Sequence, residues 1–199
     1  MNSPPELQQT QALVIGGSAG SVRTLLQILP ALPTDYPLAV MIVVHLPPYS
    51  ESGLVSLLKD SCRIQVKEAE DKEPIQPGKA YLAPPNYHLL VEPDFHLSLS
   101  SDEPVLFSRP SIDVLFESAS DAYGNALAGL VLTGANSDGA RGLSAIHSAG
   151  GRAFVQSPNS AEVATMPESA LMACPLATVL DLAQISAVLT TELPALSPR

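Results

Sequence analysis

Short apolar runs recur along this chain, and segments with helical spacing separate most of them. Continuous apolar runs of this length are typical of strands that are buried on both faces of a sheet. Strands that alternate with helices are joined by right-handed crossovers. The pattern therefore predicts an α/β fold with a doubly wound, mostly parallel sheet and helices on both faces. Predicted strands are 12–15, 38–44, 64–69, 128–133, 152–156 and 178–180, and predicted helices are 21–29, 51–59, 110–123, 140–149, 167–173 and 182–193.

The stretch between residues 79 and 100 has a different pattern. Two strand-like runs, 79–83 and 88–91, flank a turn that contains two prolines and an asparagine, and residues 96–100 alternate between polar and apolar. Strand-like runs that are separated by a few turn residues are typical of antiparallel pairing. We therefore expect a short antiparallel β-excursion near residues 80–100, which includes the run 79–83.

The two ends of the chain differ from the part between them. Residues 1–11 are polar and include two adjacent prolines, and residues 194–199 form a similar stretch. A chain of 199 residues is long enough to bury one sizeable core. We expect a disordered lead-in or linker remnant over 1–11, one folded domain over 12–193 and a tail over 194–199.

Composition narrows the classes of partner and location. The formal net charge of −10 argues against electrostatic binding to nucleic acid or to an anionic membrane. No apolar stretch is long enough to insert into a bilayer, and the first residues lack the pattern of a signal peptide. Cys62 and Cys174 are far apart and show neither a disulfide framework nor metal-ligand spacing. We expect a cytoplasmic protein with no metal site.

A glycine-rich turn between the first strand and the first helix is the first candidate for chemistry. Residues 16–20 read Gly-Gly-Ser-Ala-Gly, which is similar to the G-x-S-x-G pattern of nucleophilic serines. The glycines permit a sharp turn that exposes the hydroxyl of Ser18, and the following helix offers free N–H groups to an oxyanion. A phosphate-binding turn is the alternative, although the G-x-G-x-x-G register of dinucleotide sites is absent.

Two more loops are expected at the same edge of the sheet as Ser18. His45 follows the strand 38–44, and Asp138 lies in the loop after the strand 128–133. A serine nucleophile needs a base, and an imidazole base needs a carboxylate that fixes its tautomer. Taken singly, His45 is also compatible with a turn, and Asp138 with a turn or a helix N-cap. Together with Ser18 they favour a hydrolase, although the order Ser, His, Asp differs from that of the α/β-hydrolases.

The remaining histidines have structural interpretations. His88 follows a turn, which suggests a surface or supporting position, while His96 and His147 lie in a predicted strand and a predicted helix. We assign none of the three to the chemistry.

The chain resembles the catalytic domain of the chemotaxis receptor methylesterases, the CheB-type protein-glutamate methylesterases. The resemblance extends from about residue 12 to residue 193, and it rests on the order and spacing of several motifs. These are IGGSAG at 15–20, VHLPP at 44–48, VKEAED at 66–71, PGKAYLAP at 77–84, RPSIDVLF at 109–116, LTGANSDGA at 132–140 and ATMPE at 164–168. It implies that residues 12–193 form a methylesterase-like catalytic domain.

The resemblance also implies a reaction and roles for individual residues. Ser18 is then the nucleophile, His45 the general base and acid, and Asp138 the carboxylate that orients the histidine. The backbone N–H groups of Ala19 and Ala135 are the implied oxyanion donors. The substrate is a methylated chemoreceptor, whose glutamate γ-methyl esters are hydrolysed, and glutamine deamidation is a second implied activity. No cofactor is expected.

The sequence departs from the family's usual motifs near each of these residues. Ala19-Gly20-Ser21 replace a threonine and two glycines, and His45 lacks its usual glutamine and methionine neighbours. Ala135-Asn136 replace methionine and glycine. Since all three triad residues are retained, we expect a divergent but competent hydrolase. A catalytically silent module that binds a receptor or another partner is the alternative that the altered loop motivates.

Regulation is a further expectation from the resemblance. The family usually carries a phosphorylatable receiver domain ahead of the catalytic domain, and these 199 residues leave no room for it. If the sequence is the whole protein, we expect no control by phosphorylation in cis, and an enzyme that is either constitutively open or controlled by a regulatory protein in trans. If it is part of a longer protein, residues 1–11 are the end of a linker.

Overall fold

A parallel β-sheet forms the centre of the structure, a computed structural model that describes residues 9–45 and 53–195. Within those residues the sheet has seven strands in the order β3-β4-β2-β1-β7-β8-β9. All of the paired neighbours run parallel. The strands are β1 (Ala12–Gly17), β2 (Ala39–Val44), β3 (Gln65–Glu68), β4 (Lys79–Leu82), β7 (Leu127–Val131), β8 (Arg152–Gln156) and β9 (Thr178–Leu180).

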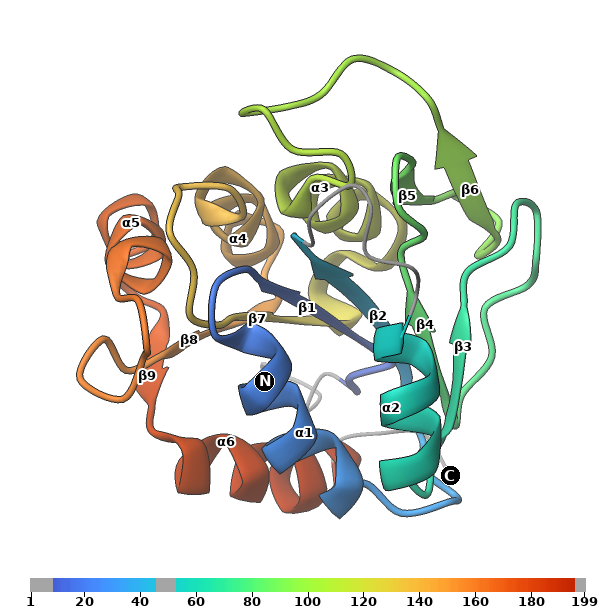
Figure 1. The fold of residues 1–199 in the computed structure, drawn as a ribbon, viewed down its shortest axis with the longest axis horizontal. Coiled ribbons are helices and arrows are strands. Elements are labelled where there is room, and N and C mark those ends of the chain that lie inside the picture. The colour runs from blue at the N-terminus through green and yellow to red at the C-terminus, as the bar shows by residue number, and fades with distance from the viewer. Residues whose placement is uncertain (1–8, 46–52, 196–199) are drawn as a thin grey trace, which may run out of the picture.

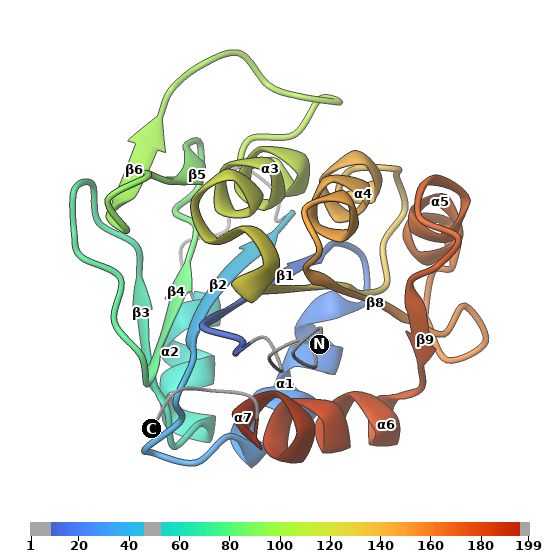
Figure 2. The same ribbon diagram turned by 180° about the vertical axis from the view of Figure 1, so that it is seen from behind.

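Helices cover both faces of this sheet (Figure 1 and, from behind, Figure 2). One face carries α1 (Ser21–Ile28), α2 (Gly53–Ser61) and α6 (Leu182–Ala187), and the other carries α3 (Ile112–Tyr123), α4 (Ala140–Ser148) and α5 (Thr165–Ala173). Each helix buries its apolar side against the sheet, so that two apolar cores form. Short elements complete the chain: η1 (Leu29–Ala31), η2 (Gly124–Ala126), the π-helical η3 (Val188–Glu192) and α7 (Leu193–Ala195). The doubly wound α/β architecture is thus confirmed.

The antiparallel excursion is present, but it is smaller than the sequence suggested. Strands β5 (His88–Val91) and β6 (Leu97–Ser100) pair antiparallel outside the main sheet. The assignment of residues 79–83 to this excursion is wrong, because β4 lies parallel between β2 and β3. The turn residues at 84–86 mark the end of β4 but do not determine which strands it pairs with. Ala80 and Tyr81 of β4 are fully buried, as is typical of a strand inside a parallel sheet that helices cover on both faces.

The strand order brings three loops together. β1 is hydrogen-bonded to β2 on one side and to β7 on the other, with Gly17 in register with Val44 and Gly16 with Val131. The carboxyl ends of these three strands therefore lie side by side. This is the point at which the connections change direction across the sheet, and ligands of open α/β sheets bind at such points.

The predictions for the two ends of the chain can be compared with the structure only in part. The predicted lead-in and tail lie largely outside the described residues, although α7 extends to Ala195. In the part of the chain that the structure describes, none of the helices is long and apolar enough to cross a membrane.

Candidate active site

Ser18 lies in the turn that connects β1 to α1. The amide of Ser18 donates to the carbonyl of Thr133 over 3.0 Å, which ties the turn to the end of β7. Gly20 begins α1 with a φ of 81°, a left-handed conformation that glycine adopts at little cost. A Cβ atom on Gly17 would lie 2.5 Å from the Cβ of Ser21, so the turn is tight. Ser18 is left partly exposed at the edge of the sheet, as predicted.

His45 extends directly from the end of β2. Its amide donates to the carbonyl of Gly17 over 3.1 Å, which continues the β1–β2 pairing by one residue and fixes the backbone beside Ser18. The side chain is 12% exposed, and its Nε2 atom lies 2.8 Å from Oδ2 of Asp138. His45 and Asp138, which are 93 positions apart in the sequence, thus form a hydrogen-bonded pair.

Asp138 is fully buried, and the N-terminus of α3 holds its carboxylate. Oδ1 accepts from the Ser111 hydroxyl over 2.9 Å and from the Asp113 amide over 2.9 Å, while Oδ2 accepts from the Ile112 amide over 2.7 Å. The first N–H groups of a helix have no partners inside the helix, and they attract negative charge. The interpretation of Asp138 as the N-cap of its own helix is wrong, since Gly139 is the N-cap of α4 and the Asp138 carboxylate binds to α3.

The charge of Asp138 follows from these contacts. Burial by itself raises the pKa of the Asp138 carboxyl, but the hydrogen bonds from His45 and from the Asp113 and Ile112 amides outweigh it and hold the pKa below its usual value. Asp138 is therefore an anion at neutral pH and accepts a hydrogen bond from Nε2–H of His45. This tautomer leaves a lone pair on Nδ1, the nitrogen that can take a proton from a nucleophile.

A second carboxylate completes the support of the site. Asp113 is buried in the first turn of α3, and its Oδ1 accepts from the amides of Gly139 over 3.0 Å and Gly142 over 2.8 Å at the start of α4. Burial raises the pKa of Asp113, and the nearby charge of Asp138 adds to that shift. The N-terminus of α3 thus binds the carboxylate of Asp138, and the N-terminus of α4 binds the carboxylate of Asp113. These reciprocal hydrogen bonds fix the loop that contains Asp138.

Sequence reasoning missed this support. From the sequence, Ser111 has no role beyond its place in the predicted helix 110–123, yet its hydroxyl binds Asp138. The Ser111 amide donates to Nδ1 of His88 over 3.1 Å, and Nε2 of the buried His88 lies 3.1 Å from the carbonyl of Glu103. The supporting role expected for His88 is thus what the structure shows, although the residue is not at the surface. The sequence signal that could have indicated this support is the presence of Ser111 and Asp113 at the start of the predicted helix.

The two predicted oxyanion donors lie close to Ser18. Ala19 follows it directly, and Ala135 follows Gly134, on which a Cβ atom would lie 3.0 Å from the Cβ of Ser18. Both alanines are exposed, and within the described residues neither amide donates a hydrogen bond. Both N–H groups are thus free to bind a ligand atom near Ser18.

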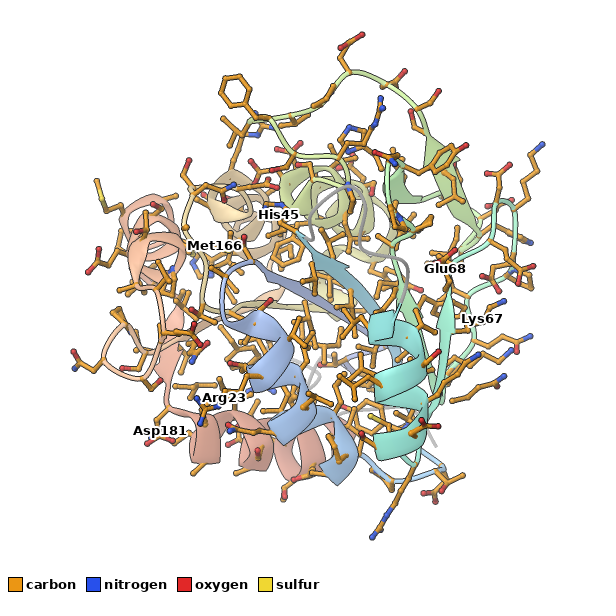
Figure 3. All side chains as sticks on the ribbon, in the orientation of Figure 1. Arg23, His45, Lys67, Glu68, Met166 and Asp181 are labelled. Atoms are coloured by element: carbon orange, nitrogen blue, oxygen red, sulfur yellow. The ribbon has the colours of Figure 1, made fainter. Side chains whose placement is uncertain are left out.

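Met166 and Asn136 border the same edge. Met166 is buried and donates from its amide to the carbonyl of Gly134 over 2.9 Å, and Figure 3 shows it on the same side of the molecule as His45. Asn136 accepts from the Asp138 amide over 3.1 Å, and its Nδ2 lies 3.5 Å from Nδ1 of His45. Within the described residues no hydrogen bond joins Ser18 to His45: His45 is paired with Asp138, while the hydroxyl of Ser18, at the same edge, makes no hydrogen bond.

No group of three side chains of the metal-ligating types comes together within residues 9–45 and 53–195. The chemistry that this edge offers is that of an exposed hydroxyl, an imidazole with a fixed tautomer and free backbone N–H groups. Such a combination suits nucleophilic acyl transfer.

Known proteins are similar to this chain in sequence and in fold. The family model for CheB methylesterase matches residues 13–189. A protein of Leptospira interrogans, whose name assigns it provisionally as a protein-glutamate methylesterase/protein-glutamine glutaminase, is 51% identical over 176 residues. That match covers 88% of this chain and 91% of the relative.

Two longer relatives are named protein-glutamate methylesterase/protein-glutamine glutaminase without a provisional qualifier. A Burkholderia lata protein is 36% identical over 202 residues, which cover 100% of this chain and 55% of the relative. A Salmonella typhimurium protein is 34% identical over 198 residues, with 98% and 56% covered. The chain therefore spans about half the length of these two relatives.

A solved structure agrees with the sequence matches. The crystal structure of the Thermotoga maritima CheB methylesterase catalytic domain superposes with a TM-score of 0.86 at 29% sequence identity, and the match covers 91% of this chain and 97% of that one. The family match over residues 13–189 and the shared fold lead to one conclusion: the chain belongs to the CheB methylesterase family.

Proposed function

We propose that this protein is a serine hydrolase that cleaves glutamate γ-methyl esters on the cytoplasmic helices of chemoreceptors. Membership of the CheB methylesterase family supports the reaction class. The observation that carries the proposal is the 2.8 Å hydrogen bond between His45 and the buried Asp138, at the strand edge where Ser18 is partly exposed. The exposed serine and the paired histidine supply the two groups that an acyl-enzyme mechanism needs.

The first half of the reaction forms an acyl-enzyme. Oγ of Ser18 attacks the γ-carbonyl carbon, and its proton passes to Nδ1 of His45, because Nε2 is occupied by Asp138. The N–H groups of Ala19 and Ala135 stabilise the oxyanion of the tetrahedral intermediate. The intermediate then expels the methoxy group, which takes the proton from His45 and leaves as methanol.

The second half of the reaction restores the enzyme. A water molecule gives a proton to Nδ1 of His45 and attacks the acyl carbon, and the Ser18 oxygen leaves with the proton that His45 returns to it. The products are a glutamate side chain and methanol, and one water molecule is consumed. Asp138 stays ionised throughout and stabilises the imidazolium form of His45.

The same steps accommodate a glutamine side chain, with ammonia as the leaving group in place of methanol. The names of the relatives include this glutaminase activity, and we propose it as the second reaction of the site. We further propose that the protein acts in the cytoplasm, where the receptor helices lie. A regulatory protein that acts in trans is proposed as its control.

Methanol release from methyl-esterified chemoreceptor tests the function. Wild type should release methanol, while Ser18→Ala and His45→Ala should abolish turnover without a change in the far-ultraviolet circular dichroism spectrum. Ser120→Ala is a suitable matched control, because this buried serine of α3 makes no side-chain hydrogen bond within the described residues. Unchanged release by folded Ser18→Ala would refute the proposal, and folded wild type without release would favour the silent binding module.

A further inference from the structure

A cavity of about 290 Å³ opens directly beside His45. Its walls come from the end of β2, from α2, from the segment that follows β4 and from the loop 101–110 that precedes α3. The imidazole of His45 forms part of the wall, so the cavity adjoins the proposed site of reaction. Most of the lining is apolar, and it includes Ile42, Val44, Leu54, Val55 and Leu82.

Arg109 is the cation in the described lining of this cavity. Its Nη1 atom donates to the carbonyls of Ser101 over 2.8 Å and of Asp102 over 3.0 Å, which fixes the guanidinium in one orientation. Within the described residues the buried Nε atom has no hydrogen-bond partner, and Arg109 forms no ion pair. A buried donor without a partner is costly, so this N–H is a candidate for a ligand atom.

The free edge of the guanidinium suits a carboxylate. Within the described residues Nε and Nη2 form no hydrogen bond, and a guanidinium can donate from this pair of atoms to both oxygens of a carboxylate. Glu68, which Figure 3 shows on β3, also lines the cavity. Within the described residues it forms no ion pair with Arg109. A bound anion is therefore favoured at the Arg109 end of the cavity and disfavoured at the Glu68 end.

The loop next to Arg109 also has an exposed apolar tip. Val105 and Ser108 pair with each other, and the two residues between them, Leu106 and Phe107, have φ values of 48° and 63°. Phe107 is 103% exposed, and it also lines the cavity. A large aromatic side chain that is held in a turn without packing inside its own chain is typical of a contact with another molecule.

We propose that this cavity is a subsite for the substrate polypeptide next to the esterified glutamate, in which Arg109 binds the carboxylate of a neighbouring acidic side chain. The inference rests on the proposed function, because the continuity with His45 makes the substrate the occupant. Arg109 thereby determines specificity and takes no part in the chemical steps. Phe107 supplies the apolar contact at the mouth of the cavity.

Binding of matched peptides tests the subsite separately from the chemistry. Two fluorescent helical peptides each carry one glutamate γ-methyl ester, flanked by glutamates in one peptide and by glutamines in the other. Their affinities are measured by anisotropy on the full chain with Ser18→Ala, which prevents turnover. The glutamate peptide should bind about 10- to 100-fold more tightly, as expected for one charge-assisted contact.

Substitutions at Arg109 identify the residue responsible. Arg109→Gln should remove the preference, and Arg109→Glu should invert it toward a lysine-flanked peptide, a gain that a misfolded loop would not produce. Arg23→Gln is the matched control: it makes the same charge change on α1, and Figure 3 shows Arg23 far from His45. It should leave the preference intact. Equal binding of the glutamate and glutamine peptides, or a preference that survives Arg109→Gln, would overturn the subsite.

A neutral small ester keeps the two proposals apart. N-acetylglutamate γ-methyl ester α-amide lacks a charged neighbour, so wild type and the Arg23→Gln control should hydrolyse it at equal rates. Failure of wild type to hydrolyse this ester, together with discrimination between the peptides, would refute the proposed function and leave the subsite as a binding site. Hydrolysis without discrimination would refute the subsite alone.

Discussion

Ser111→Ala should destabilise the protein more than an ordinary buried serine substitution does. The hydroxyl of Ser111 donates to Oδ1 of Asp138 over 2.9 Å, and both residues are fully buried. A hydrogen bond to an ionised group contributes about 1.5–3 kcal/mol, so the free energy of unfolding at pH 7 should fall by that amount. Since the Ile112 and Asp113 amides still donate to Asp138, the fold should persist.

The effect should depend on pH in a defined direction. The folded-state pKa of Asp138 lies below its usual value, so its stabilising contribution is present above the unfolded pKa of about 3.9 and is lost as pH falls through the folded value. Ser111→Ala removes a donor to the anion and should raise that folded pKa. The stability difference between wild type and variant should therefore shrink below pH 4.

Urea unfolding at pH 7 and at pH 3.5 measures both effects, with Ser120→Ala as the matched control on the same helix. The dependence of the free energy on urea should keep its slope, because the same surface becomes exposed. A loss for Ser111→Ala within about 0.5 kcal/mol of that for Ser120→Ala would refute the reasoning. So would a difference that is as large at pH 3.5 as at pH 7.

Three further predictions concern the same region. Asp138→Asn should lower kcat by about 10²- to 10⁴-fold in methanol release, because the amide no longer fixes the His45 tautomer, and an unchanged kcat would contradict the proposed role. Gly139→Ala should lower the free energy of unfolding by about 1–3 kcal/mol, since Gly139 has a φ of 93° and a Cβ there would lie 2.7 Å from the Ile112 side chain. Gly53→Ala is the matched control and should not lower it, because no atom of the described residues lies within 4 Å of a Cβ at Gly53. Phe107→Ser should raise KM for receptor substrates and leave hydrolysis of the neutral small ester and the melting temperature unchanged, whereas a lower melting temperature would indicate a role in folding.

The pattern of apolar residues was sufficient to predict most strands of the sheet. The runs at 12–15, 38–44 and 152–156 correspond to β1, β2 and β8, because continuous apolar runs mark strands that helices cover on both faces. Residues 79–83 were placed in the wrong sheet for a physical reason. Turn residues report where the chain reverses locally, whereas the parallel pairing of β4 with β2 and β3 joins segments that are distant in the sequence.

The candidate site was predictable only in part. Ser18, His45 and Asp138 could be placed at one edge because the carboxyl ends of parallel strands meet there. The support of Asp138 by Ser111 and by the N-terminus of α3 could not be predicted, since it depends on how two helices pack. The same holds for Asn136, whose amide lies 3.5 Å from Nδ1 of His45. The triad itself and the oxyanion donors remain predictions.

Covalent labelling of Ser18 tests directly whether His45 and Asp138 activate this serine as a nucleophile. The wild-type protein is treated with a fluorophosphonate, and the adduct is located by peptide mass spectrometry, with His45→Ala and Asp138→Asn treated in parallel. We expect one adduct on Ser18, with labelling that is much slower in both variants. An unlabelled Ser18 in folded wild type, or labelling that is equally fast without His45, would contradict this expectation.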